Sequence, residues 1–268
     1  MKLAPMEIGQ KFLMQKENRK IQENEVSIHL FEDGYIFSDN IKSTYYKKSL
    51  FTKKVKPSEI ESINLNETKV SFISFNKTSV FVPSIIFNEI SQKSYFKKST
   101  LNNIKFKTYF DKLNSNDIVN TFFLKENEAL LNLFPLNKIS IITHYKTILL
   151  NTIINCEKES YNDKVVYLNL QKKSFDIFYF INNKFNLSNS FNINNTDEFL
   201  YYFFYFTEQF NLDSNSFSIV FLGKFETFKT LYSAIRDFQT NIFFLNNSIK
   251  NNDYVDKHPS PFLANYFC

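Results

Sequence analysis

The sequence predicts an α/β protein built from two tandem units, each with the element order β-β-β-α-β-α-β. Two observations in the second half carry this prediction. Three β-rich runs are separated only by turn-sized gaps, and helix-like and strand-like patterns alternate after them. A weaker copy of the same order lies upstream. A chain of 268 residues can form two such units and bury their cores without disulfides.

The first half opens with a hairpin. Residues 1–24 have no firm period, and we expect an irregular lead-in there, followed by a first subdomain over residues 25–145. Asp33-Gly34 separates two alternating runs, and Asp-Gly is a strong signal for a type I′ turn. The hairpin is expected to pair residues 26–31 with residues 35–38.

Further elements of the first half follow from apolar periodicity. The expected elements are a strand within 43–51, a helix at 57–63, a hairpin or broken strand from 69–75 and 79–82, a helix from Ser84, a strand at 120–124, a helix at 126–134, a strand at 138–143 and a helix with its apolar face on Tyr145, Ile148, Leu149 and Ile153. Residues 91–117 are rich in lysine, serine and asparagine, and we expect part of this segment to be mobile.

The second subdomain is expected over residues 146–268. Its meander comprises strands at 165–170, 175–180 and 185–191. Asn195 is the expected N-cap of the next helix, and Glu198 stands at the spacing from which it can reach back to the Asn195 amide. Asp176 is expected to face solvent, and Lys172 and Lys173 to be solvated at a hairpin tip.

A strand, a helix and another strand close the second half. The helix before them carries an apolar stripe on Phe199, Phe203, Phe206 and Phe210. Residues 216–222 and 241–245 are then expected as strands, with a helix around Leu231 between them. A crossover of this length returns the chain in the same direction, so these two strands should run parallel.

Composition limits the classes of function. The two cysteines, Cys156 and Cys268, have no disulfide or metal-site pattern, which favours a reducing compartment and a cytoplasmic protein. The N-terminus has no secretory signal, and no apolar run is long enough for a membrane span. The net charge of +5 comes almost entirely from lysine, with Arg19 and Arg236 as the only arginines.

A nucleic-acid-binding protein is one alternative. It would use lysine and aromatic clusters at Tyr45-Tyr46-Lys47-Lys48, Phe51 to Lys56 and Tyr95-Phe96-Lys97-Lys98, where rings stack on bases and ammonium groups neutralise phosphate. The scarcity of arginine disfavours it, because bidentate phosphate contacts need a guanidinium group. Chance juxtapositions are also expected among 33 phenylalanines and so many lysines.

The complete pattern resembles a known fold. Two tandem β-β-β-α-β-α-β units describe the duplicated, ribonuclease H-like core of the actin-like ATPase superfamily. The 26–40 hairpin, the step from Val80-Phe81-Val82-Pro83 into Ile85-Ile86-Phe87, the start of the linking helix at His144-Tyr145-Lys146 and the 165–222 unit resemble a bacterial family of proteins of unknown function, domain of unknown function 3822. This resemblance covers nearly the whole chain.

The resemblance implies where a nucleotide would bind. Actin-like ATPases hold phosphates with one acidic, glycine-containing hairpin in each half, and hold adenosine with a glycine pair after the fourth strand of the second half. The positions that match here are Asp33 and Gly34 in the first hairpin, and Gly223 and Lys224 after the fourth strand. The second hairpin, residues 171–174, has neither an acidic residue nor a glycine. With three glycines in the chain, the loops cannot be assembled in the usual way.

The sequence therefore favours a non-catalytic binding or scaffold protein on a degenerate actin-like ATPase fold. No catalytic residue, metal site or cofactor is expected, since His29, His144 and His258 lack metal-ligand spacing and no nucleophile motif is present. The alternative of a different class is a nucleotide-binding ATPase or kinase-like enzyme. The expected partner is a protein that the sequence does not identify.

Overall fold

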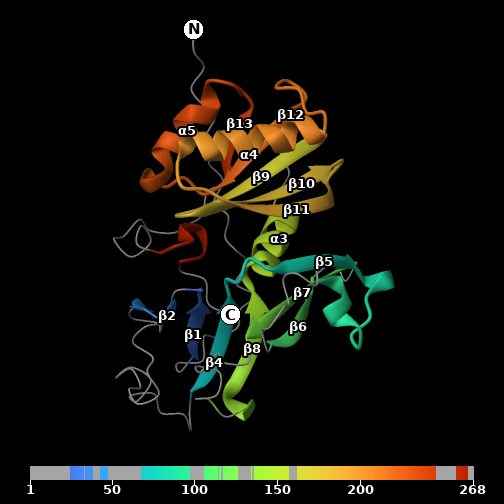
Figure 1. The fold of residues 1–268 in the computed structure, drawn as a ribbon, viewed down its shortest axis with the longest axis vertical. Coiled ribbons are helices and arrows are strands. Elements are labelled where there is room, and N and C mark those ends of the chain that lie inside the picture. The colour runs from blue at the N-terminus through green and yellow to red at the C-terminus, as the bar shows by residue number, and fades with distance from the viewer. Residues whose placement is uncertain are drawn as a thin grey trace. The chain divides into compact units, whose positions relative to one another are not determined.

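A computed structural model describes residues 25–32, 34–38, 43–47, 68–96, 106–113, 115, 117–125, 134, 136–156, 162–245 and 258–264 (Figure 1). The described residues fall into two compact units, one ending at Ile154 and the other beginning at Asn155. We call them the first and the second unit and describe each by itself. The expected lead-in and the expected helix at 57–63 lie outside the described residues, and so does the expected helix at 126–134 apart from Phe134.

The main sheet of the first unit has the strand order β3-β2-β1-β4-β8. Its elements are β1 (Glu25–Leu30), β2 (Gly34–Ser38), β3 (Ser43–Lys47), β4 (Lys69–Ser74) and β8 (Ile139–His144), followed by helix α3 (Tyr145–Asn155). β2 is antiparallel to β1 and β3, whereas β4 is parallel to β1 and β8. The strands and the linking helix expected here are therefore confirmed.

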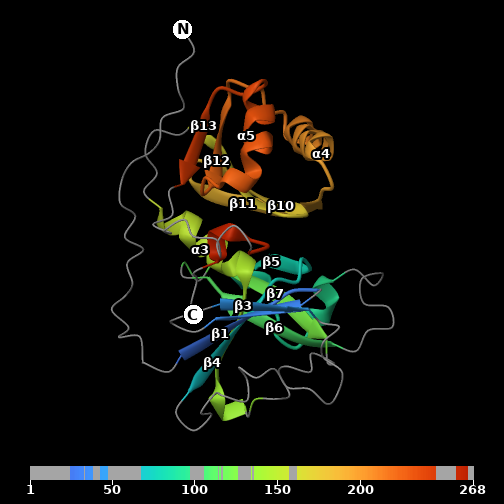
Figure 2. The same cartoon turned by 90° about the vertical axis from the view of Figure 1, so that its left-hand side faces the viewer.

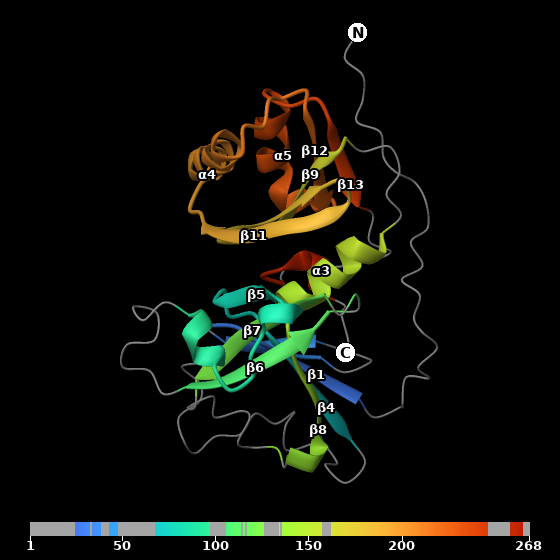
Figure 3. The same cartoon turned by 90° about the vertical axis from the view of Figure 1, so that its right-hand side faces the viewer.

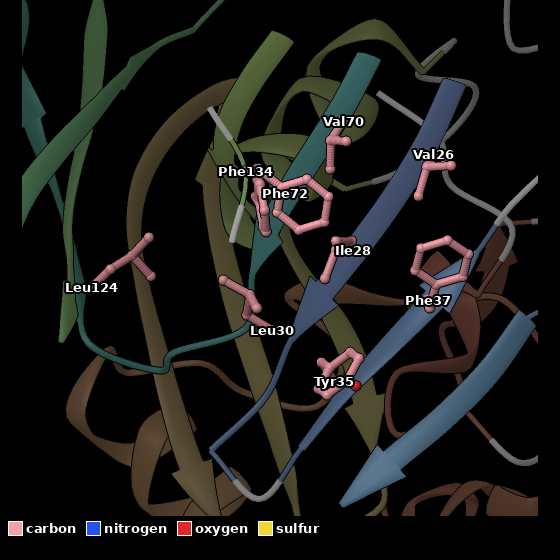
Figure 4. Packing of buried hydrophobic residues seen from close by; sticks show 9 residues of the cluster. All are labelled: Val26, Ile28, Leu30, Tyr35, Phe37, Val70, Phe72, Leu124 and Phe134. Atoms are coloured by element: carbon pink, nitrogen blue, oxygen red, sulfur yellow. The ribbon is translucent and has the colours of Figure 1, made fainter. Parts of the chain in front are cut away.

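One hydrophobic cluster of this unit's core lies on one face of the main sheet. Alternate residues of β1, namely Val26, Ile28 and Leu30, point to the same side, as the two-residue period of a strand requires. Figure 4 shows them beside Val70 and Phe72 of β4. The cluster is completed by Tyr35, Phe37, Leu124 and Phe134. This burial fixes the register of the strands, because a shift by one residue would turn the apolar set to the other face.

A second, three-stranded sheet in the first unit was not predicted. It has the order β5-β7-β6, with β5 (Ser79–Pro83), β6 (Phe106–Lys112) and β7 (Ile118–Lys125) all paired antiparallel. Of the two arrangements expected for 69–75 and 79–82, a hairpin or a broken strand, the hairpin is wrong, because β4 and β5 belong to different sheets. Within residues 91–117, β6 is a regular strand, whereas residues 97–105, 114 and 116 lie outside the described residues.

The helix expected from Ser84 is also wrong. Only two short 3-10 turns are present, η2 (Ser84–Ile86) and η3 (Gln92–Tyr95). Ile85 is 93% exposed and Ile90 is 97% exposed, so no apolar face is buried that could stabilise an α-helix. The isoleucines whose spacing favours a helix in the sequence are therefore exposed to solvent.

The sheet of the second unit has the order β11-β10-β9-β12-β13. Its strands are β9 (Lys164–Gln171), β10 (Ser174–Ile181), β11 (Lys184–Asn192), β12 (Phe217–Leu222) and β13 (Ile242–Leu245). The meander is antiparallel, and β12 is parallel to β13, as predicted. β12 is also parallel to β9. Strand order and directions thus match those of the first unit's main sheet.

Two helices cover one face of this sheet, α4 (Thr196–Gln209) and α5 (Lys229–Arg236) (Figures 2 and 3). Phe199 of α4 meets Phe175 of β10 edge-on at a centroid distance of 5.0 Å. The N-cap is confirmed, because Asn195 Oδ1 accepts the Glu198 N–H at 2.8 Å. The Glu198 carboxylate, however, accepts the N–H of Asn194 at 2.9 Å, where we expected the amide of Asn195.

Candidate functional site

The hairpin loop of the first unit is the first position at which the resemblance implies a phosphate contact. The Phe31 N–H donates to the Gly34 carbonyl at 2.8 Å, and Leu30 lies opposite Tyr35. Gly34 is therefore the first residue of β2, which corrects the expected turn at Asp33-Gly34. Asp33 itself lies outside the described residues.

The hairpin between β9 and β10 is the second expected phosphate loop. Its tip consists of Lys172 and Lys173, and both side chains are exposed, as expected. The backbone N–H of Lys172 donates to the carbonyl of Pro259 at 3.1 Å. An amide of this loop is thus already bound by the chain itself, whereas a phosphate site needs its amides directed at the ligand.

A row of polar side chains crosses β9, β10 and β11 beside this loop. Asp176 is fully buried, and its Oδ2 accepts from Asn169 Nδ2 at 2.9 Å and from Gln171 Nε2 at 2.8 Å. Its Oδ1 accepts from the Ser190 hydroxyl. The expectation that Asp176 faces solvent is therefore wrong.

The polar row lies on the sheet face opposite α4. Phe175 points to α4, and successive side chains of a strand alternate between faces, so Asp176 points away from the helix. Asn169 lies directly opposite Asp176 in the β9–β10 ladder, and Ser190 lies opposite it in the β10–β11 ladder. The ladder register alone therefore brings the three side chains together.

Gly223 follows the fourth strand of the second unit, where the resemblance places an adenosine contact. Its φ is +80°, a backbone conformation that residues with a Cβ rarely adopt. A Cβ built on Gly223 would lie 2.5 Å from Phe225 Cε2 and 3.3 Å from Phe262 Cδ2. Aromatic carbons thus occupy the space beside this glycine. Lys224 is exposed, with its Nζ 5.5 Å from the centroid of the Phe244 ring.

A segment near the C-terminus, His258–Ala264, contacts both the Lys172 loop and Gly223. We call it the closing segment. It contains η7 (Pro261–Leu263), which contacts β9 and lies on the sheet side opposite α4 (Figures 2 and 3). All its residues except Pro259 are buried. Pro259 binds the Lys172 amide, and Phe262 packs beside Gly223. The closing segment therefore joins the two expected nucleotide loops of this unit, a role that its sequence did not indicate.

A buried polar cluster surrounds the start of α3 in the first unit. Asp111 Oδ2 accepts from the His144 N–H at 2.8 Å and from the hydroxyls of Thr143 and Thr147 at 2.9 and 2.6 Å. Burial raises the pKa of the Asp111 carboxyl, and these three hydrogen bonds act against that rise. A carboxylate at a helix N-terminus is stabilising, so Asp111 docks β6 onto α3.

His144 is held neutral in this cluster. Its Nε2 donates to the Asn76 carbonyl at 2.6 Å, and its Nδ1 accepts the Lys146 N–H at 3.2 Å. Burial, followed by the charge of Lys146, lowers its pKa to about 3. A second proton would have to sit on Nδ1, which faces an N–H donor. The histidine is therefore a structural group, and it uses both ring nitrogens inside the fold.

This burial predicts acid sensitivity. Below the unfolded-state pKa of 6.5, the unfolded chain binds a proton that folded His144, with a pKa of about 3, does not bind. Neutral His144 therefore costs the folded state nothing above pH 6.5. Below that pH, it lowers the free energy of unfolding by about 1.4 kcal/mol per pH unit. The raised pKa of Asp111 acts in the opposite direction, since the folded state then binds a proton more readily.

The test compares urea unfolding of the natural chain and of His144→Gln between pH 7 and pH 4.5. Glutamine can still donate to the Asn76 carbonyl but cannot take up a proton. We expect the unfolding free energy of the variant to fall less steeply with decreasing pH, by about 1.4 kcal/mol per pH unit, which corresponds to one proton. Equal pH slopes for the two proteins would contradict the assignment to His144.

Other expected groups can be placed as well. Phe96, from the lysine and aromatic cluster at 95–98, is 5% exposed and meets Phe123 edge-on, so it does not offer a face to a base. Among the described residues, no group of three histidine, cysteine or acidic side chains is arranged to hold a metal. In the part of the chain that the structure describes, no helix has the length and apolar character that a membrane span requires.

Comparison with known proteins places the chain in a family. A model of the family described as Protein of unknown function (DUF3822) matches residues 21–242. The chain belongs to this family. A comparison with curated proteins finds no match.

Several solved structures are similar to this DUF3822 protein. A Bacteroides thetaiotaomicron protein with an actin-like ATPase fold and unknown function matches with a TM-score of 0.64 and 21% identity, covering 84% of this chain and 91% of that one. The PilM-PilN type IV pilus biogenesis complex matches with a TM-score of 0.45, 11% identity and coverages of 84% and 89%. The AlfA filament from a B. subtilis plasmid matches with a TM-score of 0.39, 10% identity and coverages of 91% and 99%. The Bacteroides thetaiotaomicron match, with its TM-score of 0.64, shows that the chain has an actin-like ATPase fold.

Proposed function

We propose that this DUF3822 protein is a non-catalytic binding or scaffold protein on an actin-like fold. The observation that carries the proposal is the filled space at Gly223. Phe225 and Phe262 occupy the position at which the superfamily's nucleotide would approach the backbone after the fourth strand. A backbone approach of this kind needs open space above a glycine, and here aromatic rings take that space.

Two further contacts support the proposal. The Lys172 amide in the second hairpin donates to Pro259, so that it is directed at the chain and not at a phosphate. Asp176, the acidic residue nearest this hairpin, accepts three hydrogen bonds from neighbouring side chains. A carboxylate that holds Mg²⁺ through water needs lone pairs directed at those waters, and the donors from Asn169, Gln171 and Ser190 compete for them.

The nucleic-acid alternative is less well supported. Of its aromatic groups, Phe96 packs inside the first unit. The Tyr95 hydroxyl accepts the Asn88 N–H at 2.8 Å and donates to the Ile86 carbonyl at 3.0 Å, which fixes it to a loop. The protein-binding function therefore remains the proposal, together with a cytoplasmic location, which rests on the cysteine pattern of the sequence.

A thermal-shift titration tests the absence of nucleotide binding. We expect no stabilisation by ATP, ADP or GTP at about 5 mM, with or without Mg²⁺. A ligand with a Kd of about 1 mM would add about 1 kcal/mol under these conditions, which corresponds to a shift of a few degrees. A known Mg²⁺-ATP-binding kinase serves as the positive control.

A saturating, Mg²⁺-dependent shift would contradict the proposal, and calorimetry would then give its stoichiometry. Phe225→Ala provides a matched variant, because it removes the ring nearest Gly223. Binding that appears only in this variant would show that the ring closes the site. Binding by the natural chain would instead support the alternative of a nucleotide-binding ATPase or kinase-like enzyme.

A further inference from the structure

Three of the most exposed large apolar side chains of the described surface lie in one loop of the first unit. We call residues 84–91, between β5 and η3, the isoleucine loop. Ile85 is 93% exposed, Ile86 63% and Ile90 97%. Single exposed apolar residues are ordinary, but three isoleucines within six positions are of the kind that marks an interaction site.

The backbone of the isoleucine loop is fixed by hydrogen bonds. The Tyr95 hydroxyl bridges the Ile86 carbonyl and the Asn88 N–H, and Asn88 Oδ1 accepts the Ile90 N–H at 2.9 Å. Phe87 packs the loop against β6, with its ring centroid 5.1 Å from that of Phe110. A loop fixed in this way loses little conformational entropy on binding, which favours recognition by a rigid partner.

Charge narrows the choice of partner. Glu89 lies between Ile86 and Ile90 and is exposed, and it makes no ion pair with any described residue. A carboxylate beside the isoleucines opposes insertion into an anionic lipid surface, which attracts basic groups. It also opposes a symmetric contact between two copies of the loop, because two carboxylates would then lie close together. The remaining complement is a protein groove that is apolar inside and basic at its rim.

We propose that the isoleucine loop docks into such a groove on a different protein. The proposal rests on the scaffold function proposed above and names the surface that would serve it. Three side chains bury far less than the ~800 Å² per partner of a standard interface, so the loop would be the energetic centre of a larger contact or the whole of a transient one.

Crosslinking identifies the partner. A photoreactive benzoylphenylalanine replaces Ile86 in one version of the full chain and Ile141, a 44% exposed isoleucine of β8, in a control version. Both are illuminated in a lysate of the organism that carries the gene. We expect one protein to crosslink at position 86 and not at position 141, and that protein is then purified.

Calorimetry with the purified partner decides the role of the loop. We expect Ile85→Ser/Ile90→Ser to raise Kd by at least about thirty-fold, because truncated hot-spot side chains cost about ten-fold each. Glu89→Lys should raise Kd by about five-fold, with a weaker effect at high salt. Ile141→Ser is the matched control and should leave Kd unchanged. All these side chains are exposed, so the variants should fold.

Several results would overturn the proposal. These are a crosslink only to a second copy of the chain, no crosslink at position 86, or binding to anionic phospholipid vesicles that the double substitution abolishes. An unchanged Kd for the double variant would reject the loop while leaving the scaffold function intact. Mg²⁺-dependent nucleotide binding would reject the non-catalytic function, whereas the crosslinking result would still judge the loop separately.

Discussion

Replacing Asp176 by alanine is expected to lower the free energy of unfolding by about 4 kcal/mol. The carboxylate is fully buried and accepts from Asn169, Gln171 and Ser190. Alanine would leave these donors without their acceptor, and each unsatisfied buried group costs about 1–3 kcal/mol. Urea unfolding at pH 7, followed by circular dichroism, measures the difference.

Asp176→Asn is the matched control for this prediction. The amide oxygen can keep the hydrogen bonds from Asn169 and Gln171, and the new NH₂ group can donate to Ser190, whose hydroxyl also accepts. We therefore expect a loss of only about 1 kcal/mol. If the alanine variant lost no more than the asparagine variant, the polar row would not stabilise the second unit as we infer.

Replacing Gly223 by alanine is expected to cost about 3 kcal/mol. The φ of +80° places a Cβ in a left-handed conformation, which costs about 1–2 kcal/mol. The same Cβ would lie 2.5 Å from Phe225 Cε2, and relieving such an overlap in a packed site costs typically about 1–3 kcal/mol. Thermal and urea unfolding of the purified variant measure the sum.

A double-mutant cycle separates these two causes. In a Phe225→Ala background, the nearest overlap is gone, and Gly223→Ala should then cost only the conformational part, about 1–2 kcal/mol. The same cost in both backgrounds would show that the backbone conformation alone requires glycine. In that case Phe225 could not be said to fill the position beside it.

Local patterns were sufficient for most elements of the second unit. The β-rich runs of β9 and β10 and the Asn195 cap of α4 are local features of the sequence, and tertiary packing did not override them. The register of the β9–β10 hairpin could also be predicted from the sequence. A two-residue turn at Lys172-Lys173 places Asn169 opposite Asp176, and a buried polar pair could have been deduced from it.

The small β5-β7-β6 sheet of the first unit could not be predicted from local patterns. β6 mixes apolar residues with Lys107, Asp111 and Lys112, and much of its surface is only partly covered, so its apolar signal is weak. β5 follows β4 closely, but it pairs with β7, which lies much later in the chain. The helical spacing from Ser84 failed because no neighbouring surface covers Ile85 and Ile90.

The sequence by itself determined the fold class, the order of helices and strands along the second unit and the scarcity of glycine that opposes a phosphate-binding site. These features depend on local periodicity and on residue types that permit special backbone conformations. Only the tertiary structure decided that Asp176 is buried, that the closing segment binds the Lys172 amide, and that Phe225 fills the space at Gly223. These contacts join residues distant in the sequence or depend on side-chain packing, and no local pattern specifies which surface a side chain will meet.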